Sequence, residues 1–125
     1  MKTVLVVDDS ATMRRMVIAS LHRLPETAFR EAANGLEAIE SLAVNPADLL
    51  VLDLNMPDMH GLEVVKFVRR HPTFKKIPII VLTTRGDDES RLATLAAGAT
   101  LYLTKPFTPE VLEESARSLL KPDAP

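Results

Sequence analysis

Polar side chains stand directly after four short apolar runs of the sequence, and their types suit metal and phosphoryl chemistry. They are Asp8, Asp9, Asp53, Thr83 and Lys105. Three carboxylates packed together repel one another unless a cation intervenes, and Mg²⁺ takes oxygen ligands and shares phosphate oxygens with carboxylates. A lysine supplies a point charge for phosphate, and a threonine hydroxyl can donate a hydrogen bond to it. The set therefore predicts a Mg²⁺ site where a phosphoryl group is placed on an aspartate.

The apolar runs that precede these residues have the length and composition of strands covered on both faces. They are short, unbroken and rich in β-branched residues, and they lie at 4–7, 49–52, 79–82 and 101–103. A weaker alternating run at 27–32 predicts an edge strand. In an open parallel α/β sheet, ligands bind beyond the carboxyl ends of the strands. We therefore expect the polar residues to meet at one edge of the sheet.

Apolar side chains at three- and four-residue spacing predict helices between the strands. The helices are expected at about 13–24, 36–43, 62–70, 87–98 and 108–119. Their inward stripes are expected to include Met16, Leu36 and Val111, whereas Arg14 and Arg15 are expected to be solvated charges. Five alternating strand–helix units predict an α/β fold, a doubly wound five-stranded parallel sheet of the (βα)5 type.

The composition is that of a single globular domain. The chain has 125 residues, of which 46% are hydrophobic, and this is enough for one core. It has no cysteine, which excludes a disulfide scaffold and a thiol nucleophile. The net charge of −2 lacks the basic footprint of nucleic-acid binding, and no apolar run approaches the roughly 20 residues of a membrane span. We therefore expect a cytoplasmic monomer with no nucleic-acid or membrane partner.

Four motifs together resemble the receiver domain of two-component response regulators, in particular the chemotaxis type. They are Val-Val-Asp-Asp-Ser at 6–10, Asp-Leu-Asn-Met-Pro at 53–57, Leu-Thr at 82–83 and Lys-Pro-Phe at 105–107. The resemblance covers nearly the whole chain, so we expect a receiver domain at 1–121 and a proline-rich tail at 122–125. It implies the flavodoxin-like, or CheY-like, strand order 2-1-3-4-5 and often a cis bond before Pro106.

The resemblance also implies a role for each polar residue. Asp53 would accept the phosphoryl group and Lys105 would pair with it. Thr83 would be the switch hydroxyl, and Tyr102 the aromatic whose rotamer follows it. A half-buried aromatic in a strand is also ordinary packing, so both interpretations of Tyr102 stay open. The ligands of Mg²⁺ would be Asp8, Asp9, Asp53 and the main-chain carbonyl of Asn55.

The resemblance implies a single-domain response regulator rather than an enzyme with turnover. A histidine kinase would donate the phosphoryl group, and the chain would assist its own phosphorylation and autodephosphorylation. The output would be phosphorylation-dependent binding of a downstream protein at the face formed by the fourth helix, fifth strand and fifth helix. Chemotaxis is one signalling output among several.

Three other functions compete with this one. A phosphatase of the haloacid dehalogenase type also uses an Asp nucleophile and Mg²⁺, but Asn55 stands where its general acid is required. The chain could be a receiver fragment of a larger hybrid kinase or regulator, with 122–125 as the start of a linker. It could also be a protein-binding module that keeps the fold without phosphorylation.

One residue departs from the chemotaxis receivers. Arg85 stands two positions after Thr83, where those receivers often carry an acidic or amide side chain that helps to position the attacking water or a phosphatase. An arginine cannot act as a base, but it can pair with the phosphoryl group. We therefore hypothesise an altered rate of autodephosphorylation.

Overall fold

The computed structural model describes residues 1–56 and 59–120, and within these residues five parallel strands form one sheet. The strands are β1 (Lys2–Val7), β2 (Thr27–Ala32), β3 (Leu49–Leu52), β4 (Ile79–Thr83) and β5 (Leu101–Thr104). Their order is β2-β1-β3-β4-β5, which confirms the predicted topology. The strand with the weak alternating pattern, β2, lies at an edge of the sheet as predicted and is only partly buried.

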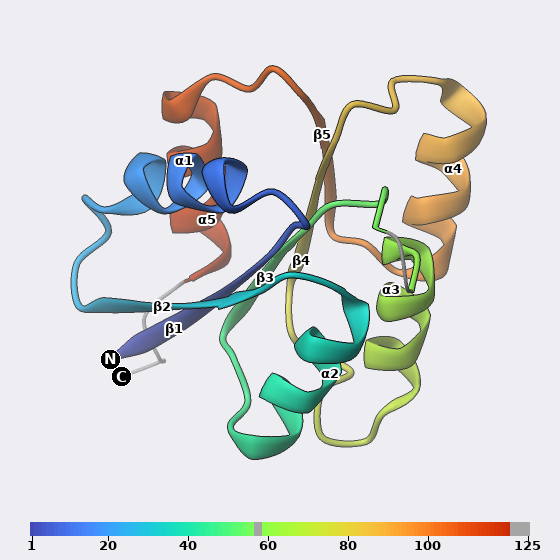
Figure 1. Ribbon diagram of the computed structural model, residues 1–125, viewed down its shortest axis with the longest axis horizontal. Helices are drawn as coiled ribbons and strands as arrows, with labels where there is room; N and C mark the ends of the chain where they lie inside the picture. The colour runs from blue at the N-terminus through green and yellow to red at the C-terminus, as the bar shows by residue number, and fades with distance from the viewer. Residues whose placement is uncertain (57–58, 121–125) are drawn as a thin grey trace.

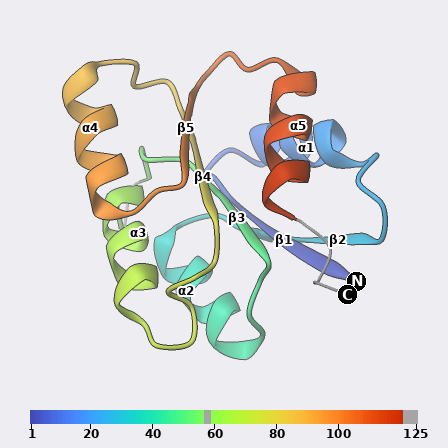
Figure 2. The same cartoon turned by 180° about the vertical axis from the view of Figure 1, so that it is seen from behind.

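Helices cover both faces of this sheet, which gives three layers. The helices are α1 (Ala11–Leu21), α2 (Gly35–Val44), α3 (Gly61–Arg70), α4 (Asp88–Ala97) and α5 (Pro109–Leu119). Helices α1 and α5 lie together on one face, and α2, α3 and α4 lie on the other (Figures 1 and 2). The expected doubly wound α/β sandwich is therefore present.

Side chains placed after the strands begin several of the helices. The Ser10 hydroxyl accepts a hydrogen bond of 3.1 Å from the Met13 N–H at the start of α1. Asp87 caps α4 in the same way, accepting from the Ser90 N–H at 2.9 Å. Such caps satisfy backbone donors that have no partner inside the helix. They fix the point at which each chain segment leaves the sheet edge and turns into a helix.

The strands alternate their side chains between two apolar clusters, one under each helical layer. Leu5 and Val7 pack toward α2, α3 and α4, while Val4 and Val6 pack toward α1 and α5. All four are almost completely buried, and burial of each such side chain contributes about 1.5–3 kcal/mol. The strands that carry the polar residues at their ends are therefore held rigidly in the core.

The inward stripes are narrower than the sequence pattern indicates. Met16, Leu36 and Val111 were expected to face inward, but they are 50%, 56% and 48% exposed. Val17 and Leu112, which neighbour two of them and belong to the same expected stripes, are buried as predicted. Consecutive helical residues point about 100° apart, so a helix of 10 or 11 residues lying on the sheet buries only one row. Residues beside that row face outward even when they are apolar.

The sequence also predicted a C-terminal boundary of the domain and the absence of a membrane-spanning segment. The predicted boundary at residue 121 and the tail at 122–125 lie outside the described residues. Within the described residues, no helix combines the length and the apolar character that crossing a membrane would require.

Candidate functional site

The candidate site lies where the strand order reverses. Strand β1 has β2 on one side and β3 on the other, and in open α/β sheets such a switch point opens a crevice beyond the carboxyl ends. Val7 is in register with Leu52, and the Asp53 N–H donates to the Val7 carbonyl at 3.0 Å. The register of β1 and β3 therefore places Asp8 and Asp53 beside each other.

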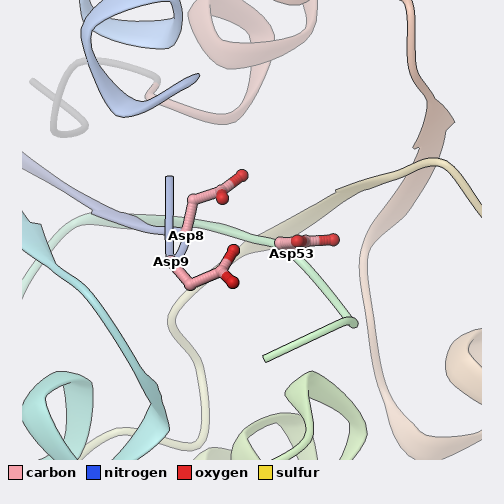
Figure 3. Close-up of side chains that lie close together, drawn as sticks. All are labelled: Asp8, Asp9 and Asp53. Carbon is pink, nitrogen blue, oxygen red and sulfur yellow. The ribbon is translucent and has the colours of Figure 1, made fainter. Parts of the chain in front are cut away.

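Three carboxylates converge at this point. One oxygen from each of Asp8, Asp9 and Asp53 lies within 4.8 Å of the others. Asp8 and Asp9 extend from the end of β1 and Asp53 from the end of β3 (Figure 3). Asp8 and Asp53 are buried, whereas Asp9 is exposed. The structure therefore brings together the acidic residues that the sequence singled out, with one of them open to solvent.

A lysine from a distant part of the chain balances part of this charge. The Nζ atom of Lys105 lies 2.9 Å from Asp8 Oδ2 and 3.6 Å from Asp53 Oδ2, and its side chain is only 11% exposed. The main chain positions it, because the Lys105 N–H donates to the Thr83 carbonyl at 2.7 Å. The bond between Lys105 and Pro106 is cis, as the resemblance implied. One lysine against three carboxylates leaves two negative charges, and oxygen donors with that charge suit a hard divalent cation.

Burial raises the pKa of Asp53 above its ordinary value. The Lys105 ammonium and the Asn55 N–H act in the opposite direction, while the neighbouring Asp8 raises the pKa further. The Thr83 hydroxyl favours the charged form slightly. The net rise of the pKa comes mainly from desolvation, because a carboxylate that is removed from water is disfavoured in its charged form. A cation placed between the carboxylates would remove much of this penalty.

Thr83 and Asn55 are also brought to the site. Thr83 is fully buried at the end of β4, and its Oγ1 accepts a hydrogen bond of 3.3 Å from the Arg85 N–H. The Asn55 N–H donates to Asp53 Oδ1 at 3.3 Å, so the main chain of Asn55 lies against the phosphoacceptor candidate. That the main-chain carbonyl of Asn55 binds a metal ion stays a prediction.

Tyr102 is tied to the loop that follows β4. Its hydroxyl donates a hydrogen bond of 2.6 Å to the Arg85 carbonyl, while its ring packs against the core cluster on the α3 and α4 side. Partial burial raises the pKa of Tyr102, and the nearby Asp87 adds to this. Arg85 itself lines a cavity of about 650 Å³ together with Leu54 and Asp87. Tyr102 therefore has both a packing role and a polar contact with the loop that contains Arg85.

Sequence reasoning missed two residues that shape the site. Arg14 is not solvated as expected: its side chain is 16% exposed, and its Nη1 donates to the Asp8 carbonyl at 2.7 Å. Gly61 packs on the chain after β3, where an added Cβ would lie only 2.8 Å from Leu54 Cα. The sequence holds one signal for Arg14, because a cation in the first turn of a helix is disfavoured by the helix dipole and needs another reason. Gly61 carries no comparable signal.

A doubly wound parallel sheet with an acidic cluster at its switch point can hold a metal ion there, and comparison with known proteins shows which family has this arrangement. Residues 4–117 match the response regulator receiver domain, and the chain belongs to this family. The chemotaxis protein CheY1 of Helicobacter pylori is 47% identical over 117 residues, which cover 93% of this chain and 94% of that protein. The chain is thus a receiver domain homologous to the CheY chemotaxis response regulators.

Solved structures agree with this assignment. The chemotaxis response regulator CheY4 of Vibrio cholerae superimposes with a TM-score of 0.86 at 39% identity, covering 96% of this chain and 99% of that one. The Mn(2+)-bound form of the response regulator Rcp1 superimposes with a TM-score of 0.82 at 28% identity, covering 95% and 91%. Receiver domains are phosphoacceptor signalling proteins that take phosphate from histidine kinases, and they are not classical enzymes. The comparisons favour neither the dehalogenase-type phosphatase nor the hybrid fragment.

Proposed function

We propose that Asp53 is the phosphoacceptor of this response regulator and that the phosphohistidine of a histidine kinase is the donor. One observation carries the proposal: the Asp53 carboxylate lies at the switch point within reach of both Lys105 and the acidic pair. A carboxylate oxygen attacks the phosphorus atom, the new P–O bond forms as the P–N bond breaks, and the donor imidazole leaves. Lys105 offsets negative charge on the transferring group.

We propose that Mg²⁺ is held by Asp8, Asp9, Asp53 and the main-chain carbonyl of Asn55. The carboxylate cluster supports this, and so does the Mn²⁺-bound form of the related Rcp1. When bound, the ion offsets the negative charge of the phosphoryl oxygens. Two protein groups favour the ionised form of Asp53 and orient it: the Asn55 N–H donates to Oδ1, and Lys105 stands on the side of Oδ2.

The output is proposed to begin at Thr83 and to reach Tyr102 through the residue between them. The Thr83 hydroxyl is held by the Arg85 N–H, and the Tyr102 hydroxyl holds the Arg85 carbonyl. A phosphoryl group on Asp53 would attract the Thr83 hydroxyl, and its movement would release one side of Arg85. Phosphorylation then biases a two-state loop rather than building a new fold. The face of α4, β5 and α5 would present that change to a downstream protein.

The decisive experiment is phosphorylation by a small-molecule donor. The protein is incubated with Mg²⁺ and acetyl phosphate, and intact-mass spectrometry is used to look for a labile gain of one phosphoryl group. The Asp53→Asn variant should show no gain. Asp48→Asn removes an exposed aspartate just before β3 and should keep the gain. A phosphoryl group retained by Asp53→Asn would refute the assignment of Asp53.

A further inference from the structure

Arg14 occupies a position that its own helix does not explain. It is the fourth residue of α1, and a cation in a first turn is opposed by the positive end of the helix dipole. Helical side chains lean toward the N-terminus, and that of Arg14 reaches back over the start of α1 to the chain after β1. Its side chain is only 16% exposed, so interactions outside the helix hold it there.

Those interactions join the edge strand to the turn that carries the acidic pair. Nη1 of Arg14 donates to the Asp8 carbonyl at 2.7 Å. Nε of Arg14 donates to Oε1 of Glu31 on β2 at 2.8 Å. The guanidinium thus uses two different edges of its planar fork, a geometry that a lysine does not reproduce. Glu31 both anchors the fork and cancels its charge.

The Asp8 carbonyl is the group that orients Asp9. A peptide unit is planar, so fixing the direction of that carbonyl fixes the N–H and Cα of Asp9 at the other end of the same unit. The rest of Asp8 is already held: its N–H donates to the Ala32 carbonyl at 3.1 Å, and Oδ1 accepts from the Ser10 N–H at 2.9 Å. Arg14 fixes the remaining group of Asp8, its carbonyl. The exposed Asp9 follows this carbonyl in the chain, and its side chain extends toward the cluster.

We propose that Arg14, anchored by Glu31, is a positioning residue that holds Asp9 in place for the metal ion. The proposal rests on the function proposed above, because it concerns the same cation site. The proposal and simple electrostatics predict opposite changes in cation affinity when Arg14 is replaced. Removing a positive charge beside a cation site should strengthen cation binding by charge alone, whereas removing the positioning contact should weaken it.

The test measures Mn²⁺ affinity of the full chain by electron paramagnetic resonance. Arg14→Met keeps the aliphatic stem and removes all donors. Arg15→Met is the matched control, because Arg15 is exposed and donates to the Ala11 carbonyl of its own helix at 3.4 Å. We expect Arg14→Met to weaken Mn²⁺ binding by about tenfold, the lower end of the loss seen when partners of metal ligands are removed. Arg15→Met should bind at least as tightly as the parent.

Thermal unfolding of the parent and the variants without metal shows whether a substitution destabilises the fold in general. If Arg14→Met does not fold, Arg14→Lys carries the same test, since it keeps the charge and loses the two-edged fork. Undiminished Mn²⁺ affinity in the folded Arg14 variant, or an equal loss in Arg15→Met, overturns the proposal while leaving the phosphoacceptor assignment intact. A parent protein that binds no Mn²⁺ overturns the proposal as well. If that parent also gains no phosphoryl group from acetyl phosphate, the proposed function falls with it.

Discussion

Replacing Asp53 with asparagine should stabilise the metal-free protein. The substitution removes a buried charge from a cluster in which two other carboxylates have an oxygen within 4.8 Å. At an effective dielectric constant of about 20, each such repulsion amounts to about 3.5 kcal/mol, and the attraction to Lys105 amounts to about 4.6 kcal/mol. The Lys105 distance used here is 3.6 Å. The two repulsions together exceed the attraction, and desolvation of Asp53 adds to them.

Solvent screens the exposed Asp9 and reduces its share, so the expected gain in the free energy of unfolding is about 1–2 kcal/mol at neutral pH. The asparagine keeps an oxygen for the Asn55 N–H, which limits the loss of hydrogen bonding. The measurement is urea denaturation in the presence of a chelator. Glu114→Gln, on the exposed part of α5, makes the same change in net charge and should leave stability unchanged.

Acid should remove the difference between the parent and Asp53→Asn. The pKa of Asp53 is raised in the folded state, so the penalty of its charge is present above that pKa and is lost as the pH falls through it. Mg²⁺ should also reduce the difference in stability between the parent and Asp53→Asn at neutral pH. At about twenty times its Kd, the ion adds about 1.8 kcal/mol to the parent and much less to the variant. A variant that is less stable than the parent in chelator at neutral pH would refute the electrostatic reasoning.

Two further predictions concern arginines near the site and behind it. Arg69 donates to the Gly98 carbonyl at 2.8 Å and the Ile77 carbonyl at 2.6 Å, so Arg69→Met should cost about 2–3 kcal/mol in urea denaturation, while the exposed Arg70→Met should cost little. Arg85→Glu replaces a cation that can pair with the phosphoryl group. We expect its acyl phosphate to decay about fivefold faster, equivalent to an exposed ion pair of ~1 kcal/mol, and equal half-lives would remove this hypothesis.

The fold and the meeting point of the site residues were predictable because both depend on local signals. Strand ends are marked by the change from apolar to polar residues, and parallel strands bring those ends to one edge. Asp8, Asp53 and Lys105 each follow such a change, and the structure brings them together. The resemblance supplied the strand order, which alternation alone does not determine.

The details that were missed depend on contacts between distant segments. The sequence places Lys105 at the site, but only the three-dimensional arrangement shows that its Nζ lies closer to Asp8 than to Asp53. Arg14 has an acceptor 17 residues away on Glu31, and nothing in the spacing of charges along the chain indicates it. The exposure of Met16 likewise depends on how much of α1 the sheet and α5 cover. Local periodicity cannot supply such information.

Under the proposed function, the contacts of the site also indicate which part would respond to a phosphoryl group on Asp53. Lys105 already stands within 3.6 Å of the Asp53 carboxylate, so it can pair with an added phosphoryl group with little displacement. Thr83 is tied to the loop after β4, because its hydroxyl oxygen accepts from the Arg85 N–H, and a displacement of the hydroxyl toward a phosphoryl oxygen would lengthen that contact. The part proposed to respond is therefore the loop from β4 to α4, which contains Arg85. Because Tyr102 holds the carbonyl of that same residue, the loop cannot shift without changing a contact of β5.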